Sequence, residues 1–171
     1  MSVKLDWLII GGGIHGVHLA ARLVGEAGVE ADTIRIIDPG EQLLERWRHC
    51  TETTGMTHLR SPSVHHLDLN PWSLQLRAGQ RSDRDPSLFA APNDRPALRF
   101  FNDHCDEVIE IFGLADLHVR ARAVACSIEG DRVHAELSNG EQLTSQKVVL
   151  AVGSSDQPDW PSWAPRNQAL I

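Results

Sequence analysis

The feature that most constrains the fold is a glycine-rich turn between an apolar strand and an amphipathic helix. It lies within the segment LIIGGGIHGVHLAARL, residues 8–23. The run LDWLII predicts a strand over 5–10, and apolar residues at helical spacing predict a helix over 14–26. The segment TIRIIDPG predicts a second strand over 33–40, ended by Pro39 and Gly40. A strand, a helix and a strand in this order form a βαβ unit, which predicts a parallel sheet.

The turn itself matches the pattern Gly-x-Gly-x-x-Gly through Gly11, Gly13 and Gly16. Gly11 allows a sharp turn, Gly13 lets a pyrophosphate approach the main chain, and Gly16 lets the helix pack closely on the sheet. Asp38 follows Gly16 by 22 residues, at the end of the second strand. An acid there accepts hydrogen bonds from a ribose 2′-OH and disfavours a 2′-phosphate. The turn therefore predicts a dinucleotide site that is not for NADP; its intervening residues are Gly12, Ile14 and His15.

The remainder of the chain predicts loops, one long helix and a meander. Residues 41–96 are rich in proline and polar clusters, and we interpret them as a loop-rich insertion with short helical turns. A helix is predicted over 96–113, with Cys105 on its apolar face. Three strands are predicted after it, and the final run KVVLAVG is apolar enough to return to the buried parallel sheet. These strands span about 117–126, 131–138 and 141–150.

Composition excludes several other classes of protein. The 171 residues suit one globular domain, and a formal net charge of −7 with scattered basic residues argues against a nucleic-acid surface. No apolar run is long enough to span a membrane, so no membrane partner is expected. Three cysteines without a CxxC spacing fit a reducing compartment, and we expect a cytoplasmic protein.

Metal and hydrolase chemistry also lack support. His49, Cys50, His58, His65 and His66 occur near one another in the sequence, but without an HExxH or paired-cysteine pattern, so no metal site is predicted. No Gly-x-Ser-x-Gly elbow is present to anchor a hydrolase triad.

The order of elements resembles the FAD-binding half of the two-dinucleotide flavoproteins. More narrowly, the chain is similar to flavin-containing monooxygenases and lysine/ornithine N-hydroxylases. The likeness covers nearly the whole chain and includes the glycine turn and IIDPG. It also includes RWRHCTETTGMTHLRSP (46–62) and LAVGSSDQPDWP (150–161). The sequence Trp47-Arg48-His49 departs from the hydroxylases' Trp-His pair. The resemblance implies a Rossmann-like, three-layer FAD/NAD(P)-binding domain with a parallel sheet and an antiparallel β-meander, over residues 1–155.

The resemblance also implies roles for individual residues. Residues 11–16 would hold the FAD pyrophosphate, with Asp38 on the adenosine ribose. The positions implied to contact or border the cofactor are Pro39, Trp47, Met56, Arg60, Val124, Ala151 and Gly153. Some of the loop histidines would line the flavin pocket. Residues 156–171 would be a linker toward an NAD(P)H domain that the chain does not contain.

The implied function is FAD binding within an NAD(P)H-dependent flavoprotein oxidoreductase of the monooxygenase type. NAD(P)H would be the reductant in a complete enzyme, and the substrate a small molecule. A second domain or a second copy of the chain would complete the site. We assign no catalytic side chain, because the flavin carries such chemistry. Two alternatives remain open: an NAD-dependent Rossmann oxidoreductase and a non-catalytic dinucleotide-binding module.

Overall fold

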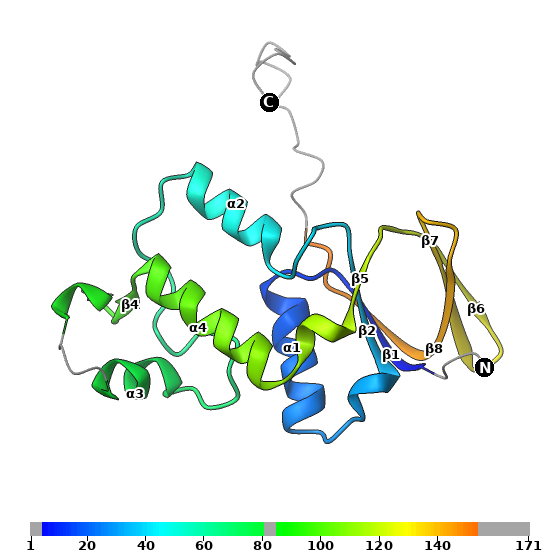
Figure 1. The fold of residues 1–171 in the computed structure, drawn as a ribbon, viewed down its shortest axis with the longest axis horizontal. Coiled ribbons are helices and arrows are strands. Elements are labelled where there is room, and N and C mark those ends of the chain that lie inside the picture. The colour runs from blue at the N-terminus through cyan, green and yellow to red at the C-terminus, as the bar shows by residue number, and fades with distance from the viewer. Residues whose placement is uncertain (1–4, 81–84, 154–171) are drawn as a thin grey trace, which may run out of the picture.

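The computed structural model describes residues 5–80 and 85–153, and a six-stranded sheet forms the centre of this part of the chain (Figure 1). Four neighbouring strands are parallel, in the order β5-β2-β1-β8. Antiparallel strands β7 and β6 continue the sheet beyond β8. The predicted parallel sheet and β-meander are therefore confirmed. The strands are β1 Leu5–Ile10, β2 Ile34–Asp38, β5 His118–Arg120, β6 Ala123–Glu129, β7 Arg132–Leu137 and β8 Gln142–Leu150.

Strand β8 belongs to both parts of the sheet, because its two halves have different partners. Residues 145–150 pair with β1, whereas residues 142–145 pair with β7. Ser145 is the register position that both pairings share, and its hydroxyl donates to the Lys147 carbonyl. The meander is therefore a continuation of the parallel sheet through this fully buried serine.

Apolar residues on opposite faces of the central strands form two separate cores. Ile9 and Ile36 pack with the helices, whereas Leu8 and Ile37 pack with residues of the meander. This alternation follows from the two-residue period of a strand, which sends neighbouring side chains to opposite faces. The helices therefore cover one face of the parallel strands, and the meander, which continues from β8, packs against the other face. These are the three predicted layers.

Two helices cover the first core, and Figure 1 shows them next to each other. Helix α1 (Ile14–Gly25) connects β1 to β2, and helix α4 (Leu98–Ile111) packs against it. Cys105 on α4 is fully buried, as its place on the apolar face predicts. The shorter elements are α2 Glu45–Thr53, α3 Ser73–Gln80, η1 Ala31–Thr33, η2 Pro86–Leu88, η3 Leu114–Leu117, β3 Phe89–Ala90 and β4 Arg95–Pro96.

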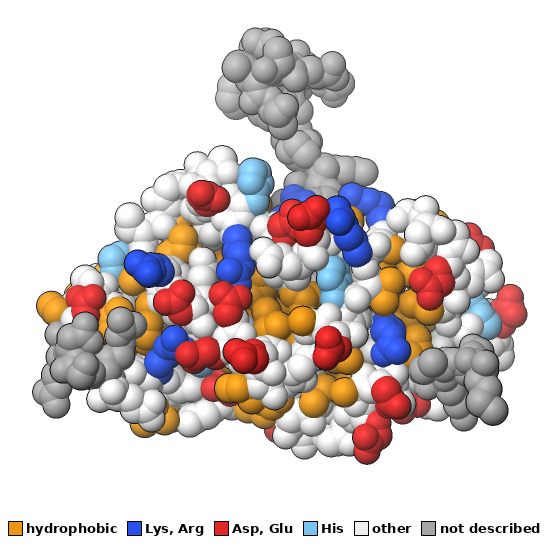
Figure 2. Space-filling model, viewed as in Figure 1, with side chains coloured by type: hydrophobic (Ala, Val, Ile, Leu, Met, Phe, Trp, Pro, Cys, Tyr) orange, Lys and Arg blue, Asp and Glu red, His pale blue; other side chains and the backbone are white. Residues whose placement is uncertain are grey.

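Polar and aromatic contacts hold α2 against α4. Trp47 Nε1 donates to Asn102 Oδ1 over 3.2 Å, and Arg48 pairs with Asp106 at an N–O distance of 2.5 Å. The Trp47 ring also lies 5.8 Å from that of Phe101, centroid to centroid. Figure 2 shows acidic and basic side chains intermixed on this face of the molecule. Exposed ion pairs contribute little to the free energy of unfolding, so the contacts of Trp47 contribute most to holding α2 against α4.

The predicted strand 117–126 is wrong as a single element. Residues His118–Arg120 form β5 at one edge of the sheet, and Ala123–Glu129 form β6 at the opposite edge. The chain leaves the first edge at Ala121, whose N–H donates to the Asp38 carbonyl. It joins the meander at Arg122, whose carbonyl accepts from the Ser138 N–H. Both halves carry a strand pattern, but they pair with different partners.

The loop-rich insertion at 41–96 contains the helices α2 and α3, in keeping with the predicted helical turns, and also the small β3–β4 hairpin, which was not predicted. The domain boundaries remain a prediction, and the predicted linker at 156–171 lies outside the described residues.

Candidate functional site

Two of the motif glycines are required by the protein's own packing. Gly11 has a φ of +113°, and a Cβ there would lie 2.4 Å from the Ala151 carbonyl oxygen. A Cβ on Gly16 would lie 1.9 Å from the Gly11 carbonyl oxygen. Such distances leave no room for a side chain. The fold therefore explains Gly11 and Gly16 without a ligand.

Gly13 is different, because nothing in the described protein requires it. Its φ of −78° and ψ of −174° suit any residue, and an added Cβ would meet no atom within 4 Å. It caps the N-terminus of α1, where no side chain caps the helix and no acidic residue lies in the first turn. Free N–H groups and the positive end of the helix dipole therefore face open space. This arrangement suits an anion.

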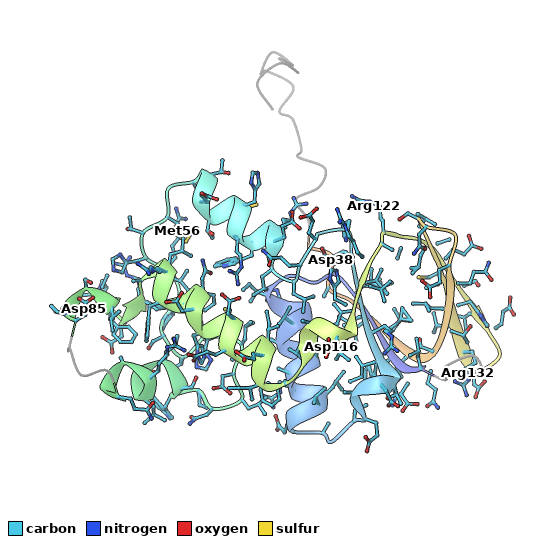
Figure 3. All side chains as sticks on the ribbon, viewed as in Figure 1. Asp38, Met56, Asp85, Asp116, Arg122 and Arg132 are labelled. Carbon is cyan, nitrogen blue, oxygen red and sulfur yellow. The ribbon has the colours of Figure 1, made fainter. Side chains whose placement is uncertain are left out.

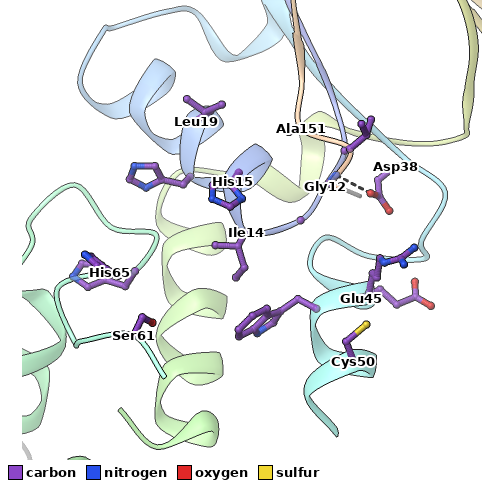
Figure 4. A pocket seen from close by; sticks show the side chains of 18 of the residues that line it. Gly12, Ile14, His15, Leu19, Asp38, Glu45, Cys50, Ser61, His65 and Ala151 are labelled. Carbon is purple, nitrogen blue, oxygen red and sulfur yellow. Dashed lines mark hydrogen bonds between the residues drawn. The ribbon is translucent and has the colours of Figure 1, made fainter. Parts of the chain in front are cut away.

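Asp38 joins the glycine turn to the loop that follows β2. Its Oδ2 accepts from the Gly12 N–H over 2.7 Å, a contact drawn in Figure 4. Its Oδ1 accepts from the Gly40 N–H over 2.9 Å. A carboxylate oxygen can accept more than one hydrogen bond, so both oxygens keep capacity for a ligand hydroxyl. The side chain is half-buried at the carboxyl end of β2.

A cleft in two parts lies across the carboxyl ends of the parallel strands. The larger hollow has a volume of about 800 Å³, and the smaller hollow about 470 Å³. Both are lined by Asp38 and by Arg46, so they meet at the turn after β2. At this point the chain connects β1 to β2, its neighbour on one side, while β8 is the neighbour of β1 on the other side. Such a switch point is where open α/β sheets bind ligands.

The larger hollow is bounded by α1, α2 and the loop between α2 and α3. Figure 4 shows Ile14 and His15 of α1 on one side of this space, Cys50 of α2 on another, and Ser61 and His65 on the loop. Trp47 lines it from α2, held by its contacts with α4. This hollow therefore has apolar, aromatic and imidazole walls.

The structure brings most of the predicted site residues to this cleft. Ten of them line one of the hollows. The larger hollow is lined by Gly11, Gly12, Gly13, Ile14, His15, Asp38, Trp47, Ala151 and Gly153, and the smaller by Pro39. Gly16 is buried beneath the turn. Of the loop histidines, His65 and His66 line the larger hollow and His49 the smaller.

Three predicted residues lie outside the lining of both hollows. Met56 is half-buried against the helical core, and Figure 3 shows it far from Asp38. Arg60 is exposed, and Val124 lies on the outer strand β6 with 59% of its surface exposed. Arg122, which precedes β6 and is labelled near Asp38 in Figure 3, lines the smaller hollow instead. The cofactor contacts assigned to these three residues remain predictions.

Several lining residues were missed by sequence reasoning. His18 and Leu19 follow the glycine turn by one helical turn, so the spacing of α1 could have indicated them. Arg46 adjoins the predicted Trp47 and could have been inferred with it. Gly40, Leu150 and Val152 likewise adjoin predicted positions. The remaining lining residues are Glu45, Cys50, Leu59, Ser61 and Phe101 in the larger hollow, and Ile10, Ile37, Ala121, Arg122 and Ala123 in the smaller.

Two buried histidines lie at the loop side of the larger hollow. Burial lowers the pKa of His66, and burial together with the neighbouring His66 lowers the pKa of His104 to about 4. Both rings are therefore neutral at pH 7.

Within residues 5–80 and 85–153, no group of three or more His, Cys, Asp or Glu side chains is arranged to hold a metal ion. No helix in the same part of the chain combines the length and apolarity needed to cross a bilayer.

The glycine turn, the acid at the end of β2 and the two-part cleft define the class: a Rossmann-type domain for a dinucleotide. A family model described as FAD-NAD(P)-binding matches residues 8–155. The chain belongs to this FAD/NAD(P)-binding family.

Solved structures of flavin enzymes share the fold. A flavin-containing monooxygenase from Stenotrophomonas maltophilia is 20% identical, with a TM-score of 0.54 over 88% of this chain and 38% of that one. Cyclohexanone monooxygenase from Rhodococcus sp. Phi1, bound to NADP+, is 15% identical, with a TM-score of 0.64 over 94% of this chain and 28% of that one. The OTEMO complex with FAD and NADP is 17% identical, with a TM-score of 0.62 over 95% and 28%. No curated protein matches significantly in sequence.

The chain spans between 28% and 38% of the length of these three structures. In fold it therefore resembles one part of flavin monooxygenases.

Proposed function

We propose that this chain is the FAD-binding part of an NAD(P)H-dependent flavoprotein oxidoreductase of the monooxygenase type. The observation that carries the proposal is Gly13. It is a glycine that the fold does not need, placed at an uncapped helix N-terminus that borders a cleft. The missing side chain is accounted for if a pyrophosphate lies against the main chain there.

The residues present fit FAD along the whole cleft. The main chain of residues 11–13 and the first turn of α1 would hold the pyrophosphate, with the positive charge of Arg46 nearby. Asp38 would accept from the adenosine ribose while it keeps the glycine turn and Gly40 in place. The smaller hollow would take the adenine. The larger hollow would take the flavin ring system, with Trp47 on one wall.

When bound, FAD supplies the redox chemistry, accepting hydride from NAD(P)H and passing electrons to an acceptor. The chain's own residues bind and orient that group. The helix N-terminus stabilises negative charge on the phosphates, and the half-buried tryptophan excludes water from one side of the larger hollow. Small-molecule substrate, NAD(P)H and either a further domain or a second copy of the chain would complete the enzyme.

FAD is favoured over NAD because, among the described residues, β5 is followed by an antiparallel meander rather than by the further βα units of a nicotinamide-binding Rossmann domain. The three free cysteines support a reducing compartment, and we propose the cytoplasm.

The test is to purify the chain, record its absorbance at about 450 nm, and titrate it with FAD and separately with NAD+. The proposal predicts that FAD binds and that released cofactor is FAD. Binding of NAD+ with no binding of FAD would instead support an NAD-dependent oxidoreductase. If neither binds, the proposal is wrong for this chain.

A further inference from the structure

Two buried histidines and the half-buried Ser73 lie on the side of the larger hollow that the loop between α2 and α3 forms. His66 lines the hollow with 8% of its surface exposed, and His104 lies behind it on α4 with 4% exposed. The first residue of α3, Ser73, lies between them: its Oγ is 3.3 Å from His66 Nε2 and 3.1 Å from His104 Nε2. The two rings meet edge to face at a centroid distance of 5.0 Å.

One fixed donor determines which nitrogen of His66 carries the proton. The main-chain N–H of Asp68 donates to His66 Nδ1 over 3.1 Å, so that nitrogen carries no proton. A neutral imidazole holds one proton, and in His66 it must therefore be on Nε2. His66 Nε2 then donates to Ser73 Oγ, whereas the same hydroxyl can either donate to His104 Nε2 or accept from it.

The surroundings agree with two neutral rings. The Pro71 main chain is also hydrogen-bonded to His66, and because proline has no N–H its carbonyl can only accept from the ring. Of the charged or titratable groups around the pair, Asp68 favours the charged form of both rings. His18 and His65 disfavour it for His66, and Arg77 disfavours it for His104. Burial outweighs the single acid, so the pKa of each ring is lowered.

We propose that Ser73 is a positioning residue: it accepts the Nε2 proton of His66 and holds that ring in the neutral tautomer set by the Asp68 N–H, so that the larger hollow ends in an uncharged wall. Both nitrogens of His66 are engaged by the protein, which leaves only its ring surface for a ligand. The same hydrogen bonds attach the loop before α3 to α4, and this loop carries Ser61 and His65 of the hollow.

The consequence for binding rests on the proposed function. A fixed, uncharged wall suits the neutral ring end of a dinucleotide, whereas the helix N-terminus at Gly13 suits its charged middle. The part of the cleft at Gly13 would thus bind the anionic phosphates, and the part at His66 would bind an uncharged ring. This division also sets the direction in which the dinucleotide lies.

The lock is tested by nitrogen-15 NMR of the imidazoles in the protein without cofactor, with His66→Gln and His104→Gln used to assign the signals. The expected result at pH 7 is a neutral Nε2–H form for His66. Ser73→Ala should shift the His66 Nε2 resonance, because its proton loses an acceptor, and Ser73→Thr, which keeps the hydroxyl, should restore it. A cationic His66 at pH 7, a proton on its Nδ1, or an unchanged Nε2 resonance in Ser73→Ala would overturn the lock.

The effect on binding is measured separately, by FAD titration of the same variants. Ser73→Ala is expected to weaken FAD binding about threefold to tenfold, because the buried His66 in the loop wall loses a hydrogen-bond partner. Ser127→Ala, an exposed serine on β6, is the matched control and should bind as the wild type. Equal affinities for the two alanine variants would overturn the positioning role. Failure of the wild type to bind FAD would contradict the proposed function, and the tautomers would still decide the lock.

Discussion

Acidification should destabilise this protein through His104, and the structure gives the size of the effect. The pKa of this ring falls from 6.5 to about 4 because of burial and the adjacent His66. Below pH 6.5 the unfolded chain binds a proton at this position that the folded protein does not take up until about pH 4. The free energy of unfolding therefore falls as the pH falls through this window. The difference in pKa corresponds to about 3 kcal/mol for His104 alone.

The assay is urea unfolding between pH 4 and pH 7, with His104→Gln compared to the wild type. Glutamine does not titrate, so the variant should lose less stability on acidification, by about 3 kcal/mol over the window. His49→Gln, at an exposed position on α2, controls for the loss of an ordinary histidine. Parallel pH profiles for wild type and His104→Gln would refute the reasoning, because they would mean that the buried ring takes up its proton as readily as the unfolded chain does.

Three further predictions concern packing and the cleft. Gly16→Ala should cost about 2 kcal/mol of unfolding free energy by urea melts, since its Cβ would meet the Gly11 carbonyl; Gly79→Ala, with open space at its Cβ, should cost nothing. A thiol reagent should label the exposed Cys50 and Cys126 in the native protein but reach Cys105 only after unfolding, because burial raises the pKa of that thiol to about 12. Asp38→Asn should cost about 1–2 kcal/mol, because one acceptor of the Gly12 and Gly40 N–H groups becomes a donor; a urea midpoint equal to wild type would contradict this.

The sequence predicts the parallel core well because the determining signals are local. A strand, a glycine turn, a helix and a second strand follow one another without interruption, and parallel strands place their carboxyl ends together. The order of these elements is therefore enough to assign Asp38 and the glycine turn to one site. The return of β8 to the parallel sheet was also predictable, because the apolar run KVVLAVG requires a buried strand, and this strand ends at the same edge as β1 and β2.

The outer parts of the cleft could not be predicted because distant contacts place them. Leu59 donates its N–H to the Pro96 carbonyl, and Leu98 donates to the Thr57 carbonyl, so the loop wall is attached to the start of α4. Nothing in the spacing of residues 57–66 indicates these partners. The split of residues 118–129 into β5 and β6 has the same origin, since only the choice of partner strand distinguishes two short strands from one long strand.

The three motif glycines also show what a pattern leaves unresolved. The same residue type serves a positive φ and close chain contact at Gly11, a helix packed on the turn at Gly16, and open space at Gly13. Only the open space at Gly13 calls for a ligand, and the sequence alone does not distinguish these three roles of glycine.

The most direct test of the account is therefore the FAD affinity of Gly13→Ala. The backbone at this position accepts alanine, at a cost of at most about 1 kcal/mol for the helix cap, so the variant should fold with nearly the wild-type urea midpoint. The account predicts that FAD binding weakens by more than about tenfold, because the new Cβ occupies the space of the pyrophosphate. Gly79→Ala should bind FAD as the wild type does. An unchanged FAD affinity in a folded Gly13→Ala protein would contradict the claim that this bare main chain holds a dinucleotide.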